Sequence, residues 1–174
     1  MEDEVWDLYT KNRIKTNLTI LKGDRIPEGY YHAVVDILVV SNTNKILLVR
    51  RALDKDVYPG LWETGAGGSV KSGETMTKAA LRELEEETGI SGKKLHVFAT
   101  DMSKIAIYTE FLVRVNDNIK ITLSNESIEY RWVTFDTFLH ILKSDPNFMP
   151  SKRARLLKKI NKIKLFMNKS YMWK

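Results

Sequence analysis

The chain has 174 residues, of which 43% are hydrophobic and 29% charged, and a net charge of +6, a composition typical of one globular domain with a single core. It contains no cysteine, which excludes disulfide bonds, thiolate nucleophiles and zinc–thiolate sites. No apolar run reaches the length of a transmembrane helix, and the acidic N-terminal segment lacks the pattern of a signal peptide, so a cytoplasmic protein is expected.

Hydrophobic patterning predicts a mixed α/β domain. The run Val34–Val40 (VVDILVV) is apolar and β-branched, as in a buried strand, and Asn42–Asn44 is a turn before a second strand. Tyr58–Gly60 interrupts the pattern, and Asp145–Pro150, which contains two prolines, is a hinge. The expected elements in chain order are a hairpin in 5–21, strands at 34–40 and 46–49, a helix at 76–88, strands at 95–100, 105–115 and 131–135, and helices at 136–142 and 152–167.

The helix between Thr75 and Gly89 is predicted from its end signals. The Thr75 hydroxyl can cap the first turn, and Gly89 can adopt the left-handed conformation that ends many helices. At about 100° per residue, one side of this helix collects a mainly apolar set, which is expected to face the core. This set consists of Thr77, Ala80, Leu81, Leu84 and Thr88.

Three glutamates of the same helix, Glu83, Glu86 and Glu87, project from a neighbouring arc, whereas Glu85 points elsewhere. Converging carboxylates repel one another unless a cation lies among them. Their hard oxygens suit Mg²⁺ or Mn²⁺, and the glycine-rich segment 65–68 allows backbone to approach the ion or a phosphate. From charge alone, the alternative is an ordinary solvated acidic face.

The spacing of these residues resembles the signature of the Nudix hydrolases. Nine positions within 23 residues match it: Gly68, Glu74, Arg82, Glu83, Leu84, Glu86, Glu87, Gly89 and Ile90. The resemblance covers roughly residues 30–145. It implies an α/β/α sandwich with a mixed β-sheet, followed here by a basic amphipathic helix. It also implies hydrolysis of a diphosphate linkage in a nucleoside diphosphate derivative or a related diphosphate.

The resemblance also implies roles for individual residues. Glu83, Glu86 and Glu87 would bind the divalent metal, together with the backbone carbonyl of Gly67. Arg82 would hold one of the glutamates through a charge-assisted hydrogen bond. The metal would neutralise the diphosphate and lower the pKa of a bound water.

These residues do not identify which side chain acts as the general base. Many relatives carry a further acid in a downstream loop, which serves as base or extra ligand. In this chain that acid is expected to be Glu126, six residues before Trp132. Glu129 is the competing choice, and Glu83 of the helix is a third candidate.

Four residues are candidate substrate contacts. Arg50 and Arg51 precede the glycine-rich segment and can face a phosphate, while Trp62 can stack on a ring. The alternatives are solvated strand-end charges for the arginines and a place in the core for the tryptophan. His32 lies at a position shared with a Nudix subgroup, where it either contacts substrate or caps a strand.

Longer segments resemble the Nudix subgroup related to isopentenyl-diphosphate isomerases. They are WDLYTKNR, EGYYHAVV and LLVRRALDKDVYPGLWE. Those isomerases depend on a catalytic cysteine and on a metal site built from histidines. This chain has no cysteine and only His32, His96 and His140, so isomerase activity is disfavoured.

The C-terminal segment 151–174 is strongly basic, with nine basic residues and no acidic one. Leu156, Ile160, Ile163 and Met167 form an apolar stripe with 4-3-4 spacing, and most of the lysines lie off it. A helix docked on its own domain, with its lysines in water, is therefore expected. The alternatives are packing on a second subunit in a homodimer and a surface for RNA or anionic lipid.

These features predict one domain, 1–174, with a hairpin extension at 1–29 and a basic helix at 151–174. The expected partner is a small-molecule diphosphate, and binding to membrane or nucleic acid is not expected. The alternative function is a catalytically inactive Nudix domain that binds a nucleotide and regulates another process. The complete set of signature residues disfavours this alternative.

Overall fold

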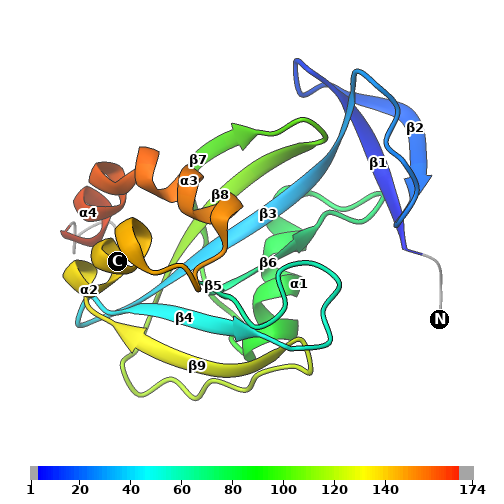
Figure 1. Ribbon diagram of the computed structural model, residues 1–174. Coiled ribbons are helices and arrows are strands. Elements are labelled where there is room, and N and C mark those ends of the chain that lie inside the picture. The colour runs from blue at the N-terminus through cyan, green and yellow to red at the C-terminus, as the bar shows by residue number, and fades with distance from the viewer. Residues whose placement is uncertain (1–3, 169–174) are drawn as a thin grey trace.

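The computed structural model describes residues 4–168, which form a mixed β-sheet between two layers of helices (Figure 1). Helix α1 (Met76–Thr88) covers one face of the sheet. Helices α2 (Phe135–Ser144), α3 (Pro150–Lys158) and α4 (Ile160–Asn168) cover the other. The predicted α/β/α sandwich is therefore confirmed.

The sheet is built around β3, which pairs with β1, β4, β6 and β8. Its pairing with β8 is parallel, whereas its other pairings are antiparallel. Strands β1 and β2 form the expected hairpin, which extends beyond the rest of the sheet (Figure 1). The strands are β1 (Val5–Thr10), β2 (Lys15–Leu21), β3 (Tyr30–Ser41), β4 (Ile46–Arg51), β5 (Trp62–Thr64), β6 (Ala66–Ser69), β7 (His96–Met102), β8 (Ala106–Val115) and β9 (Ser127–Val133).

The composition of β3 explains its central place, because both faces of the strand carry apolar side chains. Val35 and Ile37 pack toward α1, whereas Leu38 and Val40 join the core beneath α2, α3 and α4. Asp36 interrupts the second face, since side chains alternate along a strand, and it is buried. A buried carboxylate requires partners, and α3 provides them at the candidate active site.

Helix α1 has the predicted ends, but its buried face is rotated. The Thr75 side chain accepts a hydrogen bond from the backbone N–H three residues on, and Gly89 has a left-handed φ of 71°. The buried residues of the helix are Ala79, Ala80, Leu84 and Thr88. Thr77 is exposed, so its predicted place in the core is wrong. The face is rotated because Glu83 and Glu87 also turn toward the sheet.

The C-terminal segment forms two helices where the sequence predicts one. The chain breaks at Lys159, between α3 and α4, and the side chain of Lys159 pairs with acids of the sheet. Leu156, Ile163 and Met167 of the predicted stripe are buried in the core of this face. The segment is thus docked on its own domain, and the stripe is unavailable to a second subunit. Residues 169–174 of the expected helix lie outside the described residues.

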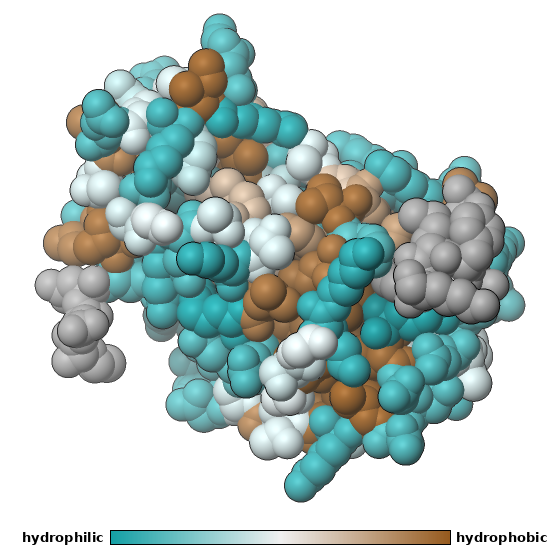
Figure 2. Space-filling view, turned by 180° about the vertical axis from the view of Figure 1, so that it is seen from behind, coloured by the Kyte–Doolittle hydropathy of each residue, from teal (hydrophilic) through white to brown (hydrophobic). Residues whose placement is uncertain are grey.

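The surface seen from behind is a mixture of hydrophilic residues and smaller apolar areas (Figure 2). Large apolar side chains that are exposed include Ile14, Leu18 and Val97. Single exposed residues of this kind are normal on folded proteins. No helix within residues 4–168 is long and apolar enough to span a membrane.

Candidate active site

The acidic edge of α1 lies against β6, where two glycines bring backbone close to the carboxylates. The N–H of Gly67 donates a hydrogen bond of 3.1 Å to Oε2 of Glu87. The Glu83 carboxylate lies against Gly68, since a β-carbon built at position 68 would be 2.3 Å from Oε1 of Glu83. Any larger residue at position 68 would therefore displace this carboxylate.

Arg82 donates four hydrogen bonds to three carboxylates of this edge. Its Nε and Nη2 each donate to a different oxygen of Glu74 at 2.9 Å, which is a bidentate pairing. Its Nη1 donates to Oε1 of Glu83 at 2.7 Å and to Oε2 of Glu86 at 3.1 Å. One guanidinium group thus orients three carboxylates, as the sequence predicts for at least one of them.

Burial perturbs the two glutamates that face the sheet. It raises the pKa of Glu87 well above its usual value, and the negative charges of Glu63 and Glu83 act in the same direction. Burial also raises the pKa of Glu83, although the neighbouring Arg82 opposes this effect. The side chain of Glu86 is 54% exposed. The inner part of the site therefore has a surplus of negative charge.

The oxygens at this edge fit a hard divalent cation. Among residues 4–168, no three acidic or histidine side chains already form a closed metal cage, and Arg82 lies between Glu83 and Glu86. No described lysine or arginine is within ion-pair distance of Glu87. The carboxylates, with the adjacent carbonyl of Gly67, are the ligand type that Mg²⁺ and Mn²⁺ prefer.

A cleft of about 280 Å³ opens beside this edge, between the sheet and α3. Gly67 and Gly68 line one part of it. Three cationic side chains, those of Arg51, Lys152 and Arg155, line another part. A cleft that joins carboxylates for a metal to cations for phosphate oxygens suits a diphosphate.

Lys152 is buried at this cleft by a set of ion pairs. Its Nζ lies 2.9 Å from Oδ1 of Asp36 and 2.5 Å from Oε2 of Glu63. Arg51 contacts the other oxygen of Glu63 at 2.9 Å. Burial disfavours the charged ammonium, but the two carboxylates outweigh it and raise the pKa of Lys152. Lys152 is therefore a fixed positive charge at the cleft.

Two more cations of the C-terminal segment extend this network. Arg155 pairs with Asp36 and, at 3.3 Å, with Oε1 of Glu110. Lys159 pairs with Oε2 of Glu110 at 2.8 Å and with Asp101 at 2.9 Å. The expectation that the lysines of this segment face water is wrong for Lys152 and Lys159. The spacing of three and four residues between the cations places them on one helix face, a signal that could have identified them.

The NUDIX domain family model matches residues 30–154, which contain the acidic edge, the glycines and most of the cleft. The chain belongs to the Nudix hydrolase family. The segment from Gly68 to Ile90 is its Nudix box. Family membership supports an enzyme that hydrolyses diphosphate linkages.

Individual relatives agree with this assignment. An uncharacterized Nudix hydrolase of Listeria innocua, lin0387, is 30% identical over 155 residues, which cover 84% of this chain and 89% of that protein. An isopentenyl-diphosphate Delta-isomerase of Corynebacterium diphtheriae is 30% identical over 128 residues, covering 66% of this chain and 70% of that protein. The crystal structure of DR0079 from Deinococcus radiodurans has a TM-score of 0.76 at 18% identity, covers 89% of this chain and 98% of that chain, and shows the same fold.

Of the two acids downstream of the Nudix box, Glu126 acts more directly on it. The pKa of Glu83 is raised chiefly by burial, and the negative charge of Glu126 adds to this effect. Glu126 pairs with Lys55 at 2.6 Å, and its side chain is 50% exposed. Glu129 instead faces Arg50 at 3.5 Å. The arrangement favours Glu126 over Glu129, and its role as base stays a prediction.

Two of the predicted substrate contacts do not line the Nudix cleft. Arg50 donates from Nε to a backbone carbonyl of the following loop and pairs with Glu129. Trp62 is buried in the core beneath α2, with the guanidinium of Arg131 4.1 Å from its ring centroid, so it is not placed to stack on a ligand. Arg51 does line the cleft, where it pairs with Glu63, and the pairing of β4 with β9 is irregular between Arg50 and Arg51.

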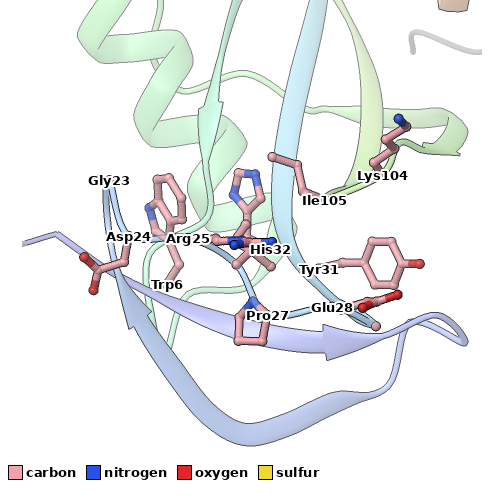
Figure 3. Close-up of a pocket in the computed structure, with 12 residues that line it drawn as sticks. Trp6, Gly23, Asp24, Arg25, Pro27, Glu28, Tyr31, His32, Lys104 and Ile105 are labelled. Atoms are coloured by element: carbon pink, nitrogen blue, oxygen red, sulfur yellow. The ribbon is translucent and has the colours of Figure 1, made fainter.

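His32, the remaining predicted contact, lies at a different pocket. Its ring stacks on that of Trp6, with centroids 4.4 Å apart and an angle of 19°. Burial lowers the pKa of His32 to about 4, so the ring is neutral at pH 7. The pocket has a volume of about 840 Å³ and lies between the N-terminal hairpin and β3 (Figure 3). It is larger than the Nudix cleft but lies apart from the carboxylates of the box.

Proposed function

We propose that the Nudix box of this chain hydrolyses a diphosphate linkage with Mg²⁺ or Mn²⁺ as cofactor. The observation that carries the proposal is the surplus of carboxylate at the inner edge of α1. Glu87 is partly buried beside Gly67 with no described lysine or arginine within ion-pair distance, and Glu83 and Glu86 share the single group of Arg82. The metal ligands proposed are these three glutamates and the carbonyl of Gly67.

Each part of the site has a distinct task in such a reaction. A divalent ion in this position neutralises diphosphate charge and lowers the pKa of bound water. Arg82 keeps the glutamates oriented, and the absence of a side chain at Gly68 leaves room for the Glu83 carboxylate. Arg51 and Arg155 line the cleft and supply positive charge to phosphate oxygens.

Glu126 is proposed as the general base that takes a proton from the attacking water. It is a carboxylate of the downstream loop whose charge acts on Glu83, and its side chain is accessible from solvent. Glu129 and Glu83 are the competing candidates. All three acids pair with a cation, Glu126 with Lys55, Glu129 with Arg50 and Glu83 with Arg82. The preference for Glu126 therefore rests on the action of its charge on Glu83.

A nucleoside diphosphate derivative or a related diphosphate is the proposed substrate. Isomerisation of isopentenyl diphosphate is disfavoured, since the chain lacks cysteine and has only three histidines. A purely regulatory nucleotide-binding domain is disfavoured by the complete box. Binding of RNA by the C-terminal segment is disfavoured because the sequence contains no recognised RNA-binding motif.

The decisive experiment is a screen of diphosphate compounds with Mg²⁺, with Mn²⁺ and with EDTA, in which released phosphate or pyrophosphate is measured. Glu86→Gln and Glu87→Gln are expected to lower the rate by orders of magnitude while the protein stays folded. Glu85→Gln is the matched control, because Glu85 lies on the same helix but is exposed and outside the cluster. Near-wild-type rates for both variants on a confirmed substrate would show that the metal assignment is wrong.

A further inference from the structure

The turn near the start of the Nudix box is bonded to a residue of the N-terminal hairpin. Asp7 of β1 accepts a hydrogen bond of 2.8 Å from the hydroxyl of Ser72 through Oδ1. Its Oδ2 accepts another of 3.0 Å from the backbone N–H of Gly73. Asp7 precedes the family match at 30–154, whereas the turn lies within it. The hairpin is therefore joined directly to the segment that carries the proposed metal ligands.

Backbone contacts bring the hairpin and this turn together. Trp6 forms an isolated antiparallel bridge with Lys71, and the N–H of Ser72 donates to the carbonyl of Val5 at 2.7 Å. In Figure 1 the connection between β6 and α1 extends to β1. Asp7 is only 5% exposed, so its carboxylate is shielded from solvent where it meets the turn.

Packing does not fix the conformation of the turn itself. The Glu74 N–H donates to the carbonyl of Lys71 at 3.0 Å, and Gly73 has a φ of 81°, as in a type II turn. Ser72 and Gly73 are exposed, and a β-carbon built at Gly73 would have no neighbour within 4 Å. Glycine has more conformational freedom than any other residue, so a turn built on it gains most from bonds to a fixed partner. Asp7 supplies two such bonds.

Asp7 is suited to this task because it is ionised and anchored on both sides. Burial alone would raise the pKa of Asp7, but hydrogen bonds from Lys15, Gly73 and Ser72 outweigh burial and lower this pKa. Nζ of Lys15, on β2, lies 2.6 Å from Oδ2 of Asp7. An ionised acceptor forms stronger hydrogen bonds than a neutral one. The carboxylate is thus held by β2 on one side and holds the turn on the other.

The position of the turn determines the position of Glu74. The Glu74 carboxylate accepts a hydrogen bond of 3.0 Å from the N–H of Lys71, and both of its oxygens bind Arg82. Arg82 in turn donates to two of the proposed metal ligands, Glu83 and Glu86. A continuous path of hydrogen bonds and one turn therefore leads from Asp7 to the acidic edge of α1.

We propose that Asp7 is a positioning residue for the metal site. It fixes the turn before α1 and acts through Glu74 and Arg82 on the carboxylates of the Nudix box. The proposal rests on the function proposed above, since these carboxylates are taken to bind the metal. Residues that orient metal ligands from outside contribute about 10- to 100-fold to metal affinity or activity. The hairpin is then a working part of the site, although it lies outside the family match.

The test measures binding of Mn²⁺ alone to the full-length protein by electron paramagnetic resonance, which detects the free ion and needs no substrate. Asp7→Ala removes both acceptors of the turn. Asp7→Asn retains both contacts, because its amide oxygen can accept from Gly73 and its amide nitrogen can donate to the Ser72 hydroxyl. Glu87→Gln identifies the fraction of Mn²⁺ that binds at the box.

Glu4→Ala is the matched control for damage to the hairpin. Glu4 is also a carboxylate of this region, and it pairs with Lys22 and accepts from Trp6 within the hairpin. Asp7→Ala is expected to weaken Mn²⁺ binding about tenfold, at the low end of the range for residues that orient ligands. Asp7→Asn is expected to weaken it by less than about threefold, since both contacts survive. Glu4→Ala leaves the affinity unchanged even where it lowers the melting temperature.

A double-mutant cycle distinguishes positioning from a general loss of stability. In a Glu74→Ala background the path from Asp7 to Arg82 is already broken, so Asp7→Ala has no further effect on Mn²⁺ affinity. Ser72→Ala, at an exposed position, removes one of the two bonds and gives a smaller loss in the same direction. This variant also tests the proposal if Asp7→Ala does not fold.

Four outcomes would overturn the proposal. They are an unchanged Mn²⁺ affinity in Asp7→Ala, an unchanged affinity in Ser72→Ala, equal losses in Asp7→Ala and Glu4→Ala, and full additivity of Asp7→Ala with Glu74→Ala. A wild type that binds no Mn²⁺ at the box would contradict the metal assignment, and the proposal with it. A wild type that binds Mn²⁺ but hydrolyses no diphosphate would contradict only the proposed function and leave the role of Asp7 intact.

Discussion

Two clusters of charged side chains meet at the Nudix cleft, and they differ in how their charges are matched. In the box, three carboxylates share one guanidinium, that of Arg82, and a fourth, that of Glu87, accepts only the backbone N–H of Gly67 within residues 4–168. In the network under α3, four acids are matched by four cations. The members of this network are Asp36, Glu63, Asp101 and Glu110 with Arg51, Lys152, Arg155 and Lys159.

This difference in charge balance distinguishes a network that stabilises the fold from a cluster that can bind a metal ion. A buried network whose charges are matched within the chain needs nothing from solution, and it fixes α3 on the sheet. A cluster with surplus negative charge gains stability when a cation enters it, as a metal-dependent site requires. Charge balance, more than the number of acids, therefore distinguishes the two.

The largest expected effect comes from ending the chain after Met149, which removes Lys152, Arg155 and Lys159 from the matched network. It also removes Leu156, Ile163 and Met167, each of which contributes about 1.5–3 kcal/mol by burial. We expect no cooperative unfolding transition by circular dichroism, since total stabilities are only about 5–15 kcal/mol. Ending the chain after Asn168 is the control. A cooperative transition in the shorter protein, near that of the control, would contradict the matched-network interpretation.

Replacing Glu126 by Gln tests whether the downstream loop supplies an acid that takes part in the reaction. If Glu126 is the general base, kcat is expected to fall by about 10² to 10⁴-fold, with metal affinity less affected. Steady-state kinetics with metal titration measure both quantities. Glu129→Gln is the paired variant. An unchanged kcat for Glu126→Gln together with a reduced kcat for Glu129→Gln would move the role to Glu129.

Replacing Lys152 by Met breaks the matched network at its most buried cation. Asp36 and Glu63 then lose a partner, and the free energy of unfolding is expected to fall by about 3–5 kcal/mol. Urea denaturation measures this change. Lys158→Met is the control, because Lys158 lies on the same helix and is exposed. Similar effects of the two variants would mean that the ion pairs of Lys152 contribute little to stability.

The smallest effect is expected from Glu87→Gln in the absence of metal. Removing one of the surplus charges should raise the free energy of unfolding by about 1 kcal/mol, as is common for relaxed functional sites. Added Mg²⁺ should raise the melting temperature of the wild type but not of the variant. Thermal denaturation with EDTA or Mg²⁺ measures both effects, with Glu85→Gln as control. A variant that is less stable without metal would contradict the idea of surplus charge.

The Nudix box helix was predictable because its signals are local. Thr75 and Gly89 mark its ends within the sequence, and the spacing of its glutamates fixes which of them converge. The short strands β5 and β6 were not predicted, because three or four residues show no alternation. Gly65 divides them with a positive φ of 45°.

The partners of the basic segment could not be predicted from the sequence. Lys152 pairs with Glu63 at a separation of 89 residues, and Arg155 pairs with Asp36 at a separation of 119. Helix and strand periodicity within a short segment contains no information about contacts between residues so far apart in the sequence. The candidate role of Trp62 in stacking on a ligand has the same origin. Only the packing of α2 and Phe148 against the tryptophan shows that its ring is part of the core.

The position of these cations along the chain has a consequence for synthesis. Chains emerge from the ribosome N-terminus first, and Lys152, Arg155 and Lys159 follow the last strand of the sheet. Until they emerge, the carboxylates of Asp36 and Glu110 can be buried only without partners, which is unfavourable. We therefore expect the sheet to remain open on this face through most of translation and to close when α3 docks.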